Sequence, residues 1–134
     1  MGLDIALTAR SASLTMQLIV HIKKSEPNTH IVLWKQANQI HGWFVHHVQN
    51  NLDDCKKYMV KRKQLKQLLE VCELSLRNKS KAAELLPSYQ GFFFGTYDYG
   101  EEYYGQIRET AEKIRQVLQI TEGKFCSFVY KASW

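Results

Sequence analysis

The 134-residue chain lacks the long apolar segments that mark membrane and secreted proteins. Its apolar runs are short, such as residues 18–20, whereas a membrane-spanning helix needs about 20 consecutive apolar residues. Asp4 and Arg10 interrupt the start of the chain, where a signal peptide would be apolar. Internal repeats, low-complexity tracts and domain linkers are also missing. We therefore expect a single domain over residues 1–134 and no membrane partner.

The chain has only three cysteines, Cys55, Cys72 and Cys126, and no two of them are close in sequence. An odd number without a Cys-x-x-Cys pair excludes a zinc ribbon and a thioredoxin-like redox motif. Reduced thiols are typical of cytosolic proteins, so we expect a cytoplasmic location. Cys72 falls on the apolar stripe of a predicted helix, which indicates a small core residue.

The histidines lack the spacing of a metal-binding helix, in which two of them lie four residues apart. His41 precedes His46 by five residues and His47 by six. We expect neither a metal nor another cofactor. The pattern instead places His41 partly buried beside an apolar stripe, with His46 and His47 on the wetter side of the helix.

No catalytic motif is present, although some side chains have suitable chemistry. Cys55 with a histidine partner would be a nucleophile, because an imidazole can hold a thiol as thiolate. Asp53, Asp54 and Asp98 would serve acid–base catalysis or hold magnesium, but nothing in the sequence places them together. Loop packing for Cys55 and capping roles for the aspartates explain them equally well. We expect no enzyme, and a small enzyme built around His41, Asp53, Asp54 or Cys55 stays as an alternative.

Hydrophobic periodicity predicts both strands and helices. Alternation with period two indicates strands within residues 3–7 and 14–23, joined as a hairpin, and a terminal strand within 125–130. Spacings of three and four residues indicate helices over 31–49, 62–77 and 99–119.

Two shorter signals complete the fold prediction. Residues 58–60 suit a brief strand, and Asp98 followed by Glu101 is typical of a capping box with Asp98 at the N-cap. Together these patterns predict an α+β fold. We expect a small antiparallel sheet formed by the N- and C-terminal strands, with about three helices packed on one face.

Charge is spread unevenly along the chain, whose net charge is +5. Residues 55–81 hold nine basic and two acidic side chains, and residues 82–104 hold four acidic and no basic ones. Several of the cations fall at the start of the predicted helix 62–77, where they oppose the helix dipole and do not stabilise the helix. Three interpretations remain: a solvated face, a nucleic-acid contact, or docking on an acidic protein surface.

The acidic block is rich in aromatic residues, with seven in residues 92–104. Such a cluster stacks on bases in some proteins, but more often it belongs to a core or to a protein-binding patch. The acidic charge of this block disfavours a neighbouring phosphate backbone. Whether Phe92-Phe93-Phe94 belongs to the core or to an interface is open at this point.

Several phrases of the sequence occur in a characteristic order. They are Met1-Gly2-Leu3-Asp4, residues 34–44 (WKQANQIHGWF), Asp53-Asp54-Cys55, Leu85-Leu86-Pro87, residues 91–95 (GFFFG), Tyr97-Asp98-Tyr99 with Tyr103-Tyr104, and Ser133-Trp134. In these phrases the chain resembles a family of small uncharacterised proteins carried by bacteriophages and by phage-derived regions of bacterial genomes. The resemblance implies a phage or mobile-element setting in a bacterial host cell, where small accessory proteins often bind a host protein.

The chain departs from the family pattern just after the Asp-Asp-Cys phrase. Relatives are acidic and tyrosine-rich there and begin the next helix with serine, whereas this chain has Lys56, Lys57 and then Lys61, Arg62 and Lys63. A basic surface at this place fits a different partner.

We therefore expect a phage or mobile-element accessory protein that acts without catalysis, by binding a host protein complex through an acidic surface of that complex. Inhibition of a host defence system such as CRISPR is one outcome of such binding, and a nucleic-acid-binding module is the alternative. The expected contact residues are basic and aromatic: Lys56, Lys57, Lys61, Arg62, Lys63, Lys66, Tyr97 and Tyr99.

Overall fold

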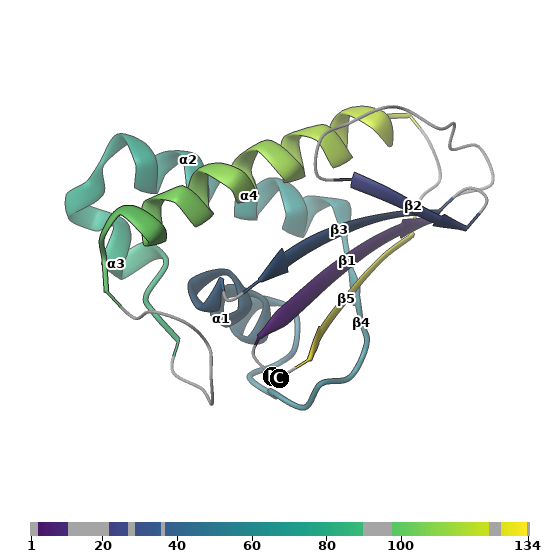
Figure 1. The fold of residues 1–134 in the computed structure, drawn as a ribbon, viewed down its shortest axis with the longest axis horizontal. Helices are drawn as coiled ribbons and strands as arrows, with labels where there is room; N and C mark the ends of the chain where they lie inside the picture. The colour runs from purple at the N-terminus through teal and green to yellow at the C-terminus, as the bar shows by residue number, and fades with distance from the viewer. Residues whose placement is uncertain are drawn as a thin grey trace.

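The computed structural model describes residues 3–10, 22–26, 29–35, 37–89, 98–123 and 127–133. Strands and helices alternate irregularly along these segments, and Figure 1 shows their arrangement. In chain order they are β1 (Asp4–Arg10), β2 (Ile22–Glu26), β3 (Thr29–Lys35), α1 (Asn38–His47), β4 (Tyr58–Val60), α2 (Arg62–Arg77), the 3-10 turn η1 (Lys79–Lys81), α3 (Ala82–Leu85), α4 (Glu101–Ile120) and β5 (Ser127–Ser133).

The strands form one antiparallel sheet in the order β2-β3-β1-β5-β4. The first strand lies at its centre and pairs with the last one along its whole length, from Asp4 opposite Ser133 to Arg10 opposite Ser127. The helices lie on one side of this sheet (Figure 1). The predicted α+β fold, with paired terminal strands and helices on one face, is therefore confirmed.

Buried and partly exposed side chains alternate along β1, and this alternation shows which face of the sheet the helices cover. Ile5 and Leu7 are buried, whereas Ala6 and Thr8 between them are partly exposed. Tyr130 lies opposite Leu7 in the register and is buried with it. The helices cover this face with apolar side chains at three- and four-residue spacing: Leu65, Leu68 and Cys72 of α2 and Ile107, Ala111, Ile114 and Val117 of α4. Cys72 has no exposed surface, which confirms it as a core residue, and this burial raises the pKa of its thiol to about 12.

Two predictions for the first third of the chain are wrong. Residues 31–35 form part of β3 and not the start of a helix, and α1 begins only at Asn38. This segment contains Ile31, Val32 and Trp34, and such β-branched and aromatic residues pack well on a sheet. The predicted hairpin is also absent, because β1 pairs with β3 and β5 while β2 pairs with β3. Residues 11–21 of that predicted hairpin lie outside the described residues.

Later elements agree better with the sequence patterns. Helix α2 and strand β4 have the predicted bounds, and α4 begins at Glu101 with Gly100 at its N-cap. The predicted capping role of Asp98 is therefore wrong, since the helix starts too late for it. Phe92-Phe93-Phe94 lies outside the described residues. Among the described helices, none has the length and apolar character that crossing a membrane requires.

Helices α2 and α4 run antiparallel (Figure 1). Arg62, the first residue of α2, donates hydrogen bonds to the Leu118 carbonyl (2.6 Å) and to Thr121 Oγ1 (2.7 Å) at the end of α4. At the opposite end, the Tyr104 hydroxyl of α4 donates to the carbonyl of Lys79, just after α2 (3.3 Å). Residues at the starts of α2 and α4 therefore lie about one helix length apart.

Candidate functional site

A chain of hydrogen bonds connects His41 to two distant parts of the sequence. Its Nδ1 lies 2.7 Å from the Tyr130 hydroxyl of β5, and its Nε2 lies 2.8 Å from Asp53 Oδ1. The Tyr89 hydroxyl also hydrogen-bonds Asp53. Helix α1, the last strand, the loop before β4 and the segment after α3 thus meet in one polar cluster, which we call the His41 cluster (His41, Asp53, Tyr89 and Tyr130).

Burial fixes the protonation of this cluster. His41 has no exposed surface, and this burial lowers its pKa even though Asp53 acts in the opposite direction. Burial also raises the pKa of the Tyr130 phenol well above its ordinary value, so that its hydroxyl keeps its proton. We therefore assign a neutral imidazole: the Tyr130 hydroxyl donates to Nδ1, and Nε2–H donates to the Asp53 carboxylate.

The loop after α1 explains how Asp53 reaches His41. Asn50 and Asn51 have φ values of 52° and 64°, a left-handed conformation that asparagine adopts more readily than most residues. These two residues follow the end of α1 and reverse the chain, so that Asp53 returns to a histidine twelve residues earlier.

Asp54 and Cys55 serve a separate turn. Asp54 accepts hydrogen bonds from the Lys56 backbone N–H (3.2 Å) and the Tyr58 hydroxyl (2.7 Å), and this second bond lowers its pKa. Cys55, which is partly buried, has a φ of 58° in the same turn. Of the four residues in the enzyme alternative, the structure joins only His41 and Asp53.

The His41 cluster can hold the fold together, and its imidazole is enclosed by the protein. Both imidazole nitrogens are occupied and the ring has no exposed surface, so a substrate cannot contact His41 in this conformation. Asp53 is the partner nearer to solvent, with 20% of its side chain exposed. Sequence reasoning missed Tyr89 and Tyr130. The only signal for Tyr130 was its place in an alternating strand.

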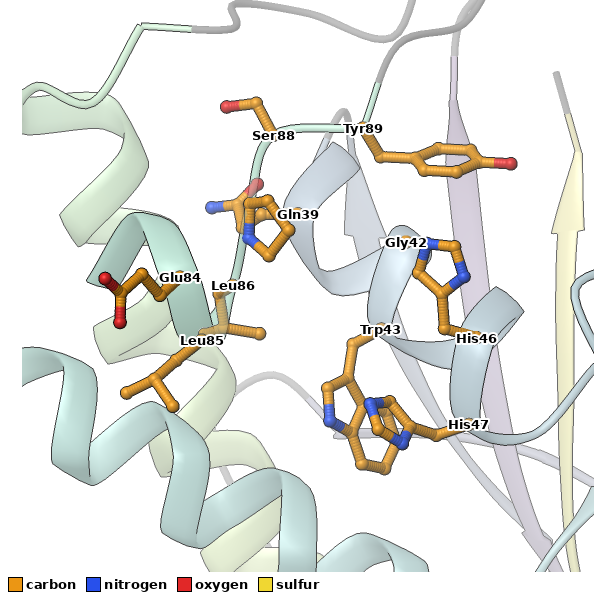
Figure 2. A pocket seen from close by; sticks show the side chains of 11 residues that line it. Gln39, Gly42, Trp43, His46, His47, Glu84, Leu85, Leu86, Ser88 and Tyr89 are labelled. Atoms are coloured by element: carbon orange, nitrogen blue, oxygen red, sulfur yellow. The ribbon is translucent and has the colours of Figure 1, made fainter. Parts of the chain in front are cut away.

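Beside this cluster lies a pocket of about 270 Å³ between α1 and residues 84–89. Figure 2 shows Leu85 and Leu86 on one side, Tyr89 and His46 on the other, and Trp43 with His47 below. The side chains from α1 belong to one helical face, because they recur at three- and four-residue spacing.

Hydrogen bonds of the backbone hold the pocket wall that residues 84–89 form. The Tyr89 N–H donates to Asn38 Oδ1 (2.9 Å), and the Ser88 N–H donates to the Tyr99 hydroxyl (3.0 Å). The Leu86 carbonyl accepts from the Tyr103 hydroxyl (2.7 Å). The pocket is thus formed by fixed walls.

Gly42 lets Tyr89 pack directly against α1. A Cβ atom on Gly42 would lie 2.8 Å from Tyr89 Cβ, closer than such atoms come. Gly42→Ala should therefore lower the free energy of unfolding by about 1–2 kcal/mol, because overpacking outweighs the better helix propensity of alanine. Urea denaturation measures the change.

Gly105 of α4 is the matched control. A Cβ there would meet only Arg108 Nη2, at 3.7 Å, an ordinary contact with a flexible side chain. Gly105→Ala should raise the free energy of unfolding by about 0.5–1 kcal/mol through helix propensity alone. Equal effects at both glycines would contradict the packing argument.

The predicted contact residues fall into separate places. The lysines of the basic block that precede or begin α2 are all exposed, and we call them the α2-start lysines: Lys56, Lys57, Lys61, Lys63 and Lys66. Arg62 is partly buried and its guanidinium is used in the hydrogen bonds to α4. Tyr99 is 45% exposed but lies at the other end of the α2–α4 pair, and Tyr97 lies outside the described residues.

Metal-binding geometry does not arise among the residues that the structure describes, since no three of their His, Cys, Asp and Glu side chains gather. His46 and His47 are exposed on α1, as predicted. His46 Nδ1 lies 2.7 Å from Asn51 Oδ1, and the His47 ring stacks on Trp43 with centroids 4.8 Å apart.

Comparison of the chain with models of known protein families, with curated proteins and with solved structures finds no match.

Proposed function

We propose that the protein is a non-catalytic accessory protein of a phage or mobile element that binds a host protein complex through an acidic surface of that complex. Inhibition of a host defence system such as CRISPR would follow where the contact blocks a working surface. One observation carries the proposal: all five α2-start lysines are exposed, and they lie close together along the chain, just before and at the start of α2.

The lack of ion pairs at most of these lysines supports the proposal. The charge of Lys56 helps to lower the pKa of Asp54, whereas Lys57, Lys61, Lys63 and Lys66 form no ion pair with a described residue. Other cations of this chain do form ion pairs, such as Lys113 with Glu109 at 2.7 Å. The first turn of α2 contains no acidic residue. Lys63 in that turn opposes the helix dipole and lowers helix stability, so the fold does not require its charge. A partner with negative charge accounts for these lysines better.

Protection of the sheet edge explains only part of this surface. β4 is an edge strand, and lysines beside an edge strand hinder unwanted pairing with other chains. Lys57 and Lys61 flank β4 and suit this role. Lys63 and Lys66 lie on α2, beyond the edge, so edge protection does not account for them.

A groove of about 320 Å³ between α2 and α4 favours a protein partner over a nucleic acid. Its lining combines charged side chains, such as Lys66, with the partly buried Leu69 and Leu118. A phosphate backbone gains nothing from the leucines, whereas protein interfaces combine an apolar centre with a charged rim. If a nucleic acid were the partner, affinity would fall steeply with salt.

Charge reversal tests the proposal. The variant Lys61→Glu/Lys63→Glu/Lys66→Glu should weaken binding to the host complex by about 100-fold or more, because attraction becomes repulsion. Arg62 stays unchanged in this variant, because its guanidinium holds α2 to α4. Calorimetric titration of the purified host complex with each variant measures the affinity.

The control Arg77→Glu/Lys79→Glu/Lys81→Glu makes the same change in net charge at the far end of α2. Its affinity should stay within about threefold of the wild-type value, since the far end of α2 is more than a Debye length from the start of α2 at physiological salt. Equal losses in both variants would show a general effect of net charge and contradict a specific contact at the α2 start.

A further inference from the structure

The outer face of the sheet is open where β4 and β5 pair. Met59 of β4 is 65% exposed and lies opposite Val129 of β5, which is partly exposed. Val60 and Tyr130 in the same strands are buried against the helices. Met59 and Val129 therefore form an apolar spot on the face that the described helices leave uncovered.

Two lysines continue the line of Met59 on this outer face. Side chains two residues apart in a strand point to the same side, so extending β4 by one residue at each end sets Lys57 and Lys61 on the side of Met59. The backbone of Lys61 is still extended, with φ −85° and ψ 148°, so the alternation continues to that residue. Both lysines are exposed.

A third lysine widens the basic surface. Met59 pairs with Val129 and Tyr58 with Tyr130, and extending this register by one residue sets position 57 beside Lys131. Lys131 is exposed. Like charges on facing strands destabilise a sheet, so this pair of lysines does not serve the stability of the fold.

We propose that this face, with Met59 at its centre and Lys57, Lys61 and Lys131 around it, docks an acidic amphipathic helix of the partner. The inference rests on the proposed function and names the structural element that the partner presents. Alternate strand positions are about 6.7 Å apart. Helix positions i and i+4 are about 6 Å apart. A helix with the pattern Glu-x₃-Leu-x₃-Glu therefore sets Leu on Met59 and a carboxylate near each flanking lysine.

The composition of the face favours a helix over single-stranded nucleic acid. Sequence-tolerant binding of single strands relies on aromatic side chains that stack on bases. The described side chains on this face at β1, β4 and β5 include Ala6, Thr8, Met59 and Val129, and none of them is aromatic. Met59 is flexible and polarisable, and such side chains adapt to the apolar face of a helix.

The test is a titration of the ¹⁵N-labelled full chain with a synthetic helical peptide that carries the Glu-x₃-Leu-x₃-Glu pattern on one face. A peptide of the same composition, with Glu and Leu scrambled around the helix, is the control. The patterned peptide should give saturable shifts at the backbone amides of residues 57–61 and 127–131. Met59→Glu, and separately Lys57→Glu/Lys131→Glu, should weaken its binding by about tenfold or more, since each removes the centre or the charge of the contact.

The variant Lys63→Glu/Lys66→Glu separates this inference from the proposed function, because those lysines lie on α2 and not on the sheet face. It should leave peptide binding within about threefold. Amide shifts confined to α2, or equal binding of the scrambled peptide, would overturn the docking face. If the protein still captures the host complex in that case, the proposed function stands without the docking face. Binding of a (dT)₂₀ oligonucleotide to this face without binding of the peptide would overturn it in favour of nucleic acid.

Discussion

Replacing His41 by alanine is expected to lower the free energy of unfolding by about 3–5 kcal/mol. The change removes a fully buried ring and leaves the hydroxyl of Tyr130 and the carboxylate of Asp53 without their shared partner. Both effects add, because a cavity forms and buried polar groups lose hydrogen bonds. His41→Gln should cost less, since its amide can still bond one of the two neighbours.

Urea denaturation measures this loss, with His46→Ala as the control. His46 lies on the same helix but is exposed, so its replacement should change the free energy of unfolding by less than about 1 kcal/mol. A small effect of His41→Ala, similar to that of His46→Ala, would show that the His41 cluster does not hold the fold together.

The free energy of unfolding should also decrease as the pH is lowered through the range where an ordinary histidine takes up a proton. Burial lowers the pKa of His41 below its ordinary value of 6.5 in the folded protein, so the unfolded chain binds the proton more readily. The contribution of His41 is therefore fully present above pH 6.5 and is lost as the pH falls toward the folded-state pKa. Uptake of one proton on unfolding changes the free energy of unfolding by at most about 1.4 kcal/mol per pH unit.

Denaturation of the wild type and of His41→Gln at pH 7.5, 6.5 and 5.5 tests this coupling. The wild type should lose more stability on acidification than the variant does, and the difference between the two should narrow as the pH falls. A variant His41→Gln with the full wild-type slope would assign the proton uptake to another group.

The fold was predictable where a local pattern and the tertiary environment agree. Helix α2 matches its predicted range because its apolar stripe meets the sheet on one face, and the stripe alone marks both ends. The apolar spacing of residues 31–35 continues into α1 and by itself predicts a helix. The pairing of β3 with β1 decides their conformation, and that long-range contact has no local signal.

The candidate site was predictable in its parts and not in its arrangement. The residue types of His41 and Asp53 indicate possible catalytic groups, but the contact between them depends on two left-handed asparagines. The two tyrosines that complete the cluster come from distant segments. The basic surface was found from charge alone. The sequence does not show that this basic surface lies far from Tyr99, because that distance follows from the antiparallel packing of α2 and α4.

The most direct test of the central claim is capture with the tagged protein from nuclease-treated lysate of the bacterial host at moderate salt. The α2-start variant Lys61→Glu/Lys63→Glu/Lys66→Glu serves as the matched negative. We predict a stoichiometric host protein complex with the wild type and its loss with the variant. Capture of the same complex by the variant, or no protein with the wild type, would contradict an acidic host surface as the partner.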